Sequence, residues 1–77
     1  MKHVEFLNNL SDEQMLQIID DIRITTEETG EIPKLSLIRD VAKLCSEDFN
    51  IPYNLTLGLN VIHKEIMERY RIILTNK

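Results

Sequence analysis

Apolar residues recur every three or four positions in the last third of the chain, which is the spacing of one face of an α-helix. The series is Leu55, Leu59, Ile62, Ile66, Tyr70 and Ile73. With Asn54 as N-cap, it predicts a helix over residues 55–75 whose main stripe faces the core. Leu57, Val61 and Ile72 fall on roughly the opposite side. Such a helix is either sandwiched between other helices or docked on another chain.

A second helical pattern opens with Ser11–Gln14, which has the spacing of a capping box. Apolar residues follow at helical intervals, and Gly30 suits the position just past a helix end. The pattern predicts a helix over residues 12–28. Its last turns should be weakened by the threonines Thr25, Thr26 and Thr29.

The third pattern is LSLIRDVAKL, in which Val41 and its apolar neighbours form a core stripe. Pro33 is compatible with a first helical turn, so we predict a helix over residues 34–48. The connector that follows contains Asn50, suited to a left-handed cap, and Pro52, which disfavours helix before it. We expect two apolar connector residues, Phe49 and Ile51, to anchor it in the core.

The composition favours helix throughout, because only two Gly and two Pro occur among 77 residues. Apolar residues make up 43% of the chain, which is enough for one core. Residues 2–9 are compatible with a further short helix that needs packing to be stable. We therefore predict an all-α protein with a single domain over residues 1–77. Its expected architecture is a small bundle of three main helices plus the short N-terminal helix.

The single cysteine, Cys45, cannot form an internal disulfide, and we expect it to be buried. A small fold without disulfides suits a reducing compartment, so we expect a cytoplasmic protein. The sequence contains no apolar run of the length of a signal peptide or a transmembrane helix.

The net charge of −4 is unevenly distributed. Residues 1–31 contain two basic and eight acidic residues, whereas residues 32–77 contain seven basic and five acidic residues. An acidic first half repels a phosphate backbone and attracts basic partners.

The sequence has no arrangement typical of catalysis or metal binding. Its only His and Cys side chains are His3, His63 and Cys45, and their spacing matches no zinc motif. The adjacent carboxylates of residues 20–21 and 27–28 point about 100° apart on a helix, so neither pair can share a substrate proton. We expect no enzymatic activity, no cofactor and no metal site.

Three segments, Leu37–Val41, Ser46–Ile51 and Leu59–Lys64, together resemble a family of small double-stranded-DNA-binding proteins of T-even-type phages. The shared features are a charged helix, a short acidic connector and a helix that ends in an aliphatic-His-Lys run. The resemblance covers about residues 37–64. It implies a short helical phage protein that acts as a transcription accessory.

Our first hypothesis is a non-enzymatic regulatory module that binds another protein. The acidic helix would attract a basic partner, and the back of the last helix would supply apolar contacts. The residues assigned to this surface are Asp12, Glu13, Asp20, Asp21, Glu27, Glu28, Leu57, Val61 and Ile72.

Two alternatives stay open. The first is direct binding to double-stranded DNA, for which the candidate residues are Arg39, Lys43, Lys64, Arg69 and Arg71. The second is a structural homodimer formed through the last helix. None of the three hypotheses involves a membrane.

Overall fold

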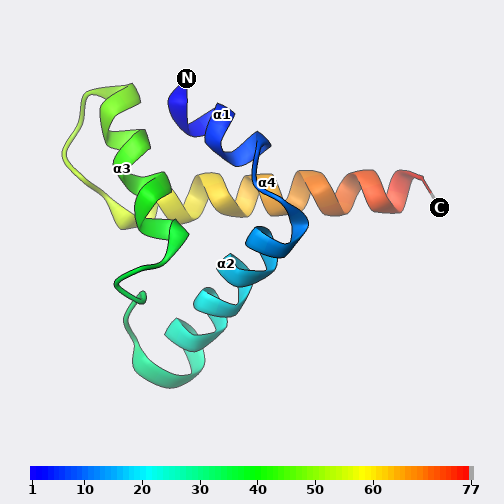
Figure 1. Ribbon diagram of the computed structural model, residues 1–77, viewed down its shortest axis with the longest axis horizontal. Coiled ribbons are helices and arrows are strands. Elements are labelled where there is room, and N and C mark those ends of the chain that lie inside the picture. The colour runs from blue at the N-terminus through cyan, green and yellow to red at the C-terminus, as the bar shows by residue number, and fades with distance from the viewer. Residues whose placement is uncertain (77) are drawn as a thin grey trace.

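Four α-helices and one π-helical turn make up most of residues 1–76, the part of the chain that the computed structural model describes (Figure 1). The elements are α1 (Lys2–Asn8), α2 (Asp12–Ile24), the π turn η1 (Thr25–Thr29), α3 (Leu37–Phe49) and α4 (Leu55–Thr75). The predicted all-α fold is confirmed. No strand occurs within these 76 residues.

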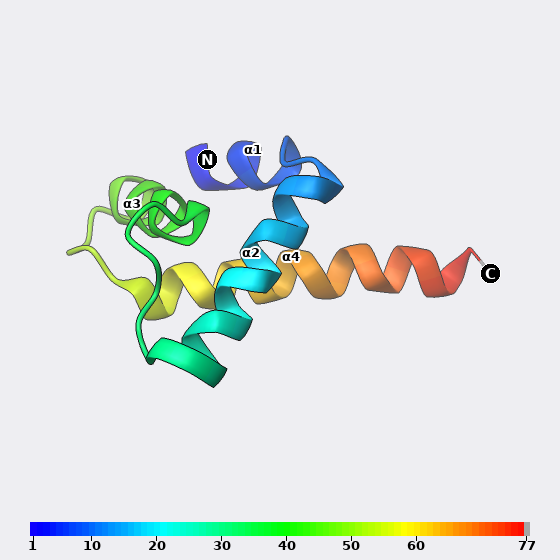
Figure 2. The same ribbon diagram turned by 60° about the horizontal axis from the view of Figure 1, so that its bottom comes forward.

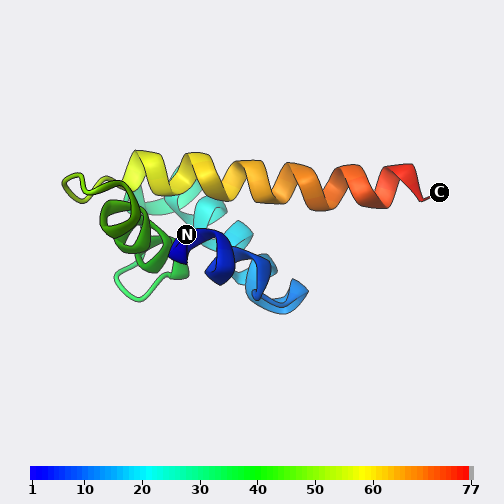
Figure 3. The same ribbon diagram turned by 90° about the horizontal axis from the view of Figure 1, so that it is seen from above.

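Each helix contributes to one hydrophobic core. α3 packs against both α1 and α4 (Figures 1 and 2), and α1, α2 and α3 all lie on the same side of α4 (Figure 3). The most deeply buried apolar residues are Leu7, Leu10, Met15, Ile18, Ile38, Val41, Cys45 and Ile62. α4 crosses α3 where Gly58 lies directly against Ala42.

Four predicted capping residues, Ser11, Gly30, Asn50 and Asn54, are confirmed. Ser11 Oγ accepts from the Gln14 amide at 3.1 Å, and Gln14 Oε1 accepts from the Ser11 amide at 2.9 Å. Asn54 Oδ1 accepts from the Leu57 amide at the start of α4. Left-handed residues close the two other ends, Gly30 with φ 74° and Asn50 with φ 53°.

The end of the second predicted helix differs from the expectation. Residues 25–29 form a π turn instead of frayed α-helix. The hydroxyl of Thr25 donates to the Asp21 carbonyl at 2.8 Å, and that of Thr26 donates to the Ile22 carbonyl at 3.0 Å. The threonine hydroxyls therefore donate hydrogen bonds to the backbone where its hydrogen-bond pattern changes from α-helical to π-helical, rather than simply weakening the helix.

The third helix begins at Leu37, not at residue 34 as predicted. Its N-cap is Ser36, whose hydroxyl oxygen accepts from the Ile38 amide. Pro33 lies in the preceding turn, where Arg39 donates to its carbonyl oxygen. A side-chain cap and a tertiary hydrogen bond thus decide where the helix starts.

The expectation that Phe49 and Ile51 anchor the connector in the core is wrong, because both side chains are exposed, by 42% and 40%. The polar residue Asp48 is the anchor instead. Its two carboxylate oxygens accept from the backbone amides of Lys2 and His3 at 3.0 and 2.8 Å. The last turn of α3 therefore holds the first turn of α1, an attachment that apolar periodicity does not reveal.

Candidate functional site

The C-terminal end of α4 projects beyond the other helices (Figures 1 and 3). A 21-residue helix is about 30 Å long, whereas the 13 residues of α2 or α3 cover about 20 Å. Residues 70–76 are all exposed. The fold therefore leaves the last turns of α4 without cover from the described part of the chain.

Arg69 marks the point where α4 leaves the body. Its Nη2 donates to the carbonyl oxygens of Leu7 and Leu10 at 3.0 and 2.8 Å. The same guanidinium contacts Glu65 and Asp12. These bonds join α4 to the turn between α1 and α2, so the position of the projecting end is well defined.

Two apolar grooves meet on this projecting end. One, of about 260 Å³, lies between α2 and α4 and is lined by Leu16, Ile19, Ile66, Tyr70 and Ile73, among others. The second is a shallow, open face of α4 alone, formed by Ile66, Met67, Tyr70, Arg71, Leu74 and Thr75. Ile66 and Tyr70 line both grooves, which makes them one continuous surface. We call it the α2–α4 apolar surface: Leu16, Ile19, Ile66, Met67, Tyr70, Ile73 and Leu74.

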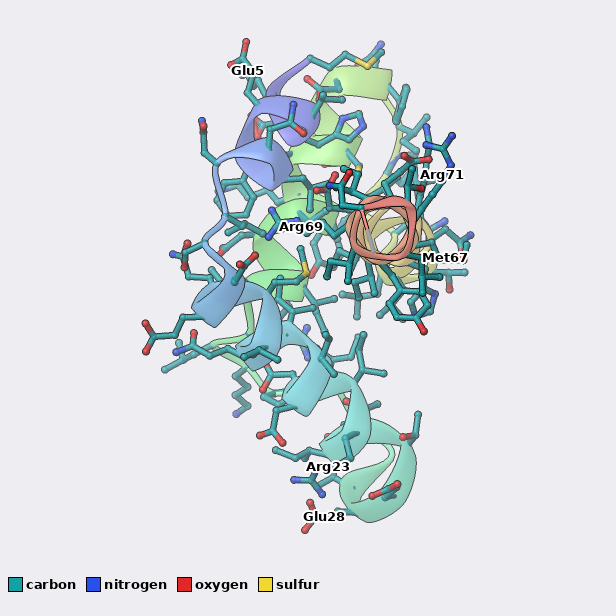
Figure 4. The ribbon with its side chains drawn as sticks, turned by 90° about the vertical axis from the view of Figure 1, so that its right-hand side faces the viewer. Glu5, Arg23, Glu28, Met67, Arg69 and Arg71 are labelled. Carbon is teal, nitrogen blue, oxygen red and sulfur yellow. The ribbon has the colours of Figure 1, made fainter. Side chains whose placement is uncertain are left out.

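The side chains of this surface are unusually exposed for their size. Leu16 is 64% exposed, Met67 66% and Tyr70 61%. Figure 4, which looks down α4, shows Arg69 directed to the body of the protein and Met67 directed away from it. Single exposed apolar residues are ordinary, whereas large contiguous groups of them are typical of interaction surfaces.

Of the apolar residues predicted for partner binding, the structure places only one on an open surface. Leu57 and Val61 are half-buried and pack against the core, contrary to their expected outward position. Ile72 is 54% exposed but lies about 200° around α4 from Tyr70. The three predicted apolar residues therefore do not form one patch. The open apolar surface lies on the side of α4 that is opposite to Ile72.

The acidic residues do not form one continuous face. Asp20, Glu27 and Glu28 surround Arg23 with N–O distances of 3.0, 3.6 and 3.3 Å. Arg23 and Glu28 lie at the end of α2 that points away from α4 (Figure 4). Asp12 instead pairs with Arg69 at 3.2 Å. The two other residues, Glu13 and Asp21, form no ion pair within residues 1–76.

Two of the five cations assigned to DNA binding are engaged inside the protein. Arg39 donates to the carbonyl oxygens of Ile32 and Pro33 at 2.6 and 3.0 Å, and Arg69 bonds the α1–α2 turn. Arg71 lies 3.8 Å from Glu68. Lys43 and Lys64 are exposed on different helices. The structure does not gather the five into one basic face.

Cys45 and His3 are titratable residues that the fold buries. Cys45 is fully buried, as predicted, and burial together with the charge of Asp48 raises the pKa of its thiol. His3 is buried, and its Nδ1 lies 2.5 Å from Asp48 Oδ2. The Cys45 thiol is thus kept protonated and away from solvent, which is unsuited to nucleophilic chemistry.

Within residues 1–76, no three His, Cys, Asp or Glu side chains converge as a metal site would require.

The signal that would have revealed the surface is helix length. Ile66, Tyr70 and Ile73 were predicted to face the core, because periodicity alone does not distinguish a core from an interface. Comparing the 21 residues of α4 with the shorter partner helices shows that its end cannot be covered.

Fold and site together define a small all-α protein with an open apolar surface at one end. Comparison of the chain with protein-family models, curated proteins and solved structures gives no match. None of the helices in residues 1–76 combines the length and apolar character that crossing a membrane requires.

Proposed function

We propose that this protein is a non-enzymatic, regulatory protein-binding module whose α2–α4 apolar surface receives an amphipathic helix of a partner. The observation that carries the proposal is the groove between α2 and α4, bordered by the exposed side chains of Leu16, Tyr70 and Ile73. Helix-in-groove recognition uses apolar anchors at helical spacing, which such a groove fits.

The helix that borders the groove is acidic overall. α2 contains Asp12, Glu13, Asp20 and Asp21 against a single cation, Arg23, although Asp12 is already paired with Arg69, which also lines the groove. Complementary charges at an interface increase the association rate and select the partner. The partner that we propose is therefore a helix with an apolar stripe and basic residues on its flank.

The chain offers a closely matched pair of variants to test this. Ile72 and Ile73 are adjacent, both belong to the projecting end, and they are 54% and 59% exposed. Only Ile73 lines the groove. Ile73→Asp should abolish capture of the partner from a native lysate, whereas Ile72→Asp should capture it as the wild type does. Equal capture by both variants would contradict the proposal.

Direct DNA binding, which the resemblance to phage DNA-binding proteins implies, is the competing hypothesis. Phosphate contacts dominate DNA affinity, and Arg39 and Arg69 already donate to backbone carbonyls. A fluorescence-anisotropy titration with duplex DNA at about 50 mM salt separates the two hypotheses. We expect no binding; a complex whose affinity falls steeply with added salt would favour DNA.

A further inference from the structure

We infer that the helix that occupies the α2–α4 apolar surface is the projecting end of α4 from a second copy of this chain. The inference rests on the proposed function and names the partner for it. The two copies would be related by a two-fold axis, and the α4 end of each copy would pack on the α2–α4 apolar surface of the other.

The exposed area of this chain exceeds the average for compact monomers of the same mass. The protein exposes 5559 Å² at a mass of 9.0 kDa, whereas compact monomers of that mass expose about 4,900 Å². The surplus of about 700 Å² is close to the roughly 800 Å² that each partner buries in a standard interface. The radius of gyration, 12.7 Å, likewise exceeds the roughly 11.5 Å expected for 77 residues.

The end of α4 has the chemistry that the groove requires. Met67, Tyr70 and Leu74 form an exposed apolar stripe at intervals of three and four. Arg71 lies beside this stripe with its side chain 75% exposed, and in Figure 4 it points away from the body of its own chain. A cation at this position suits the net negative charge of α2, although two carboxylates of that helix, Asp12 and Asp20, already pair with Arg69 and Arg23.

A two-fold arrangement follows because donor and receiver are the same surface. Tyr70 lines both the groove between α2 and α4 and the groove along α4 alone. An isologous interface places each such residue near the symmetry axis and uses each contact twice. It also brings Arg71 of α4 in each copy toward the acidic α2 of the other.

Sedimentation equilibrium of the 77-residue chain across micromolar concentrations tests the inference. We expect a monomer–dimer equilibrium for the wild type and for Ile72→Asp. Ile73→Asp should raise the dimer dissociation constant at least about tenfold, because it places a charge in an apolar contact. Circular dichroism of both variants checks that the helices remain folded.

The other outcomes are distinguishable. A wild type that stays monomeric overturns the second copy as occupant, yet leaves the proposed function standing if capture from lysate still separates Ile73→Asp from Ile72→Asp. Continued growth beyond dimers indicates head-to-tail contact and overturns the two-fold arrangement. If Ile72→Asp and Ile73→Asp weaken the dimer equally, the interface does not lie on the α2–α4 apolar surface.

Discussion

Gly58 of α4 lies so close to Ala42 of α3 that a Cβ added at position 58 would be 2.8 Å from the Ala42 Cβ and 3.0 Å from its Cα. Both residues are buried, so neither helix has room to yield without shifting the core. The crossing therefore requires glycine for its lack of a side chain, even though glycine weakens a helix.

This relationship predicts that Gly58→Ala destabilises the protein. Alanine gains up to about 1 kcal/mol in helix propensity, but overpacking a rigid contact costs about 1–3 kcal/mol. We expect a net loss of about 1 kcal/mol in the free energy of unfolding, measured by urea titration at fixed protein concentration. Asn60→Ala, an exposed change in the same helix, should be neutral or slightly stabilising. A Gly58→Ala protein more stable than the wild type would show that the helices can separate at no cost.

Arg69→Gln should destabilise the protein more than Arg71→Gln. Arg69 is 23% exposed in its side chain and donates to two main-chain carbonyls, which lose a charged donor in the variant. Hydrogen bonds to charged groups contribute about 1.5–3 kcal/mol. Arg71, with a side chain 75% exposed, should change the free energy of unfolding by less than about 0.5 kcal/mol. Equal effects in urea titrations of the two variants would contradict the role given to Arg69.

The hydrogen bonds of Asp48 predict that the protein loses stability in acid. The amide of His3 is the main cause that lowers the pKa of this carboxyl to about 2, and the His3 ring and the Lys2 amide act in the same direction. A folded-state pKa below the unfolded value stabilises the protein above about pH 4, and that contribution is lost as the pH falls toward 2. The stability difference between the wild type and Asp48→Asn should therefore shrink between pH 4 and pH 2. A difference independent of pH in this window would mean that the contact does not involve the charged carboxylate.

The sequence predicts those features of the fold that depend on neighbouring residues. The caps at Ser11, Asn50 and Asn54 need only side chains and backbone a few positions apart, and all three are confirmed. The Ser36 cap of α3 is equally local, but Pro33 gave a competing start signal. The bonds of Asp48 to the amides of Lys2 and His3 join residues 46 and 45 positions apart. Such contacts leave no periodic signal.

The site was predictable only in part, for a related reason. An apolar stripe on α4 was evident, but its Ile62 lies in the core whereas its Tyr70 and Ile73 lie in solvent. The division falls at Arg69, where hydrogen bonds to the α1–α2 turn end the contact of α4 with the body. Hydrophobicity is the same on both sides of that point, so apolar periodicity alone cannot separate core from interface.

Amide hydrogen exchange of α4 as a function of protein concentration tests the central claim most directly, because it reports whether the α2–α4 apolar surface becomes covered. An isolated helix end of a few turns is marginally stable in water, so the amides of residues 70–75 should exchange rapidly in dilute wild-type protein. At high concentration we predict that their exchange slows, together with that of the α2 segment around Leu16. In Ile73→Asp it should stay fast at every concentration. Exchange of residues 70–75 that is the same in dilute and concentrated wild-type protein would contradict the account.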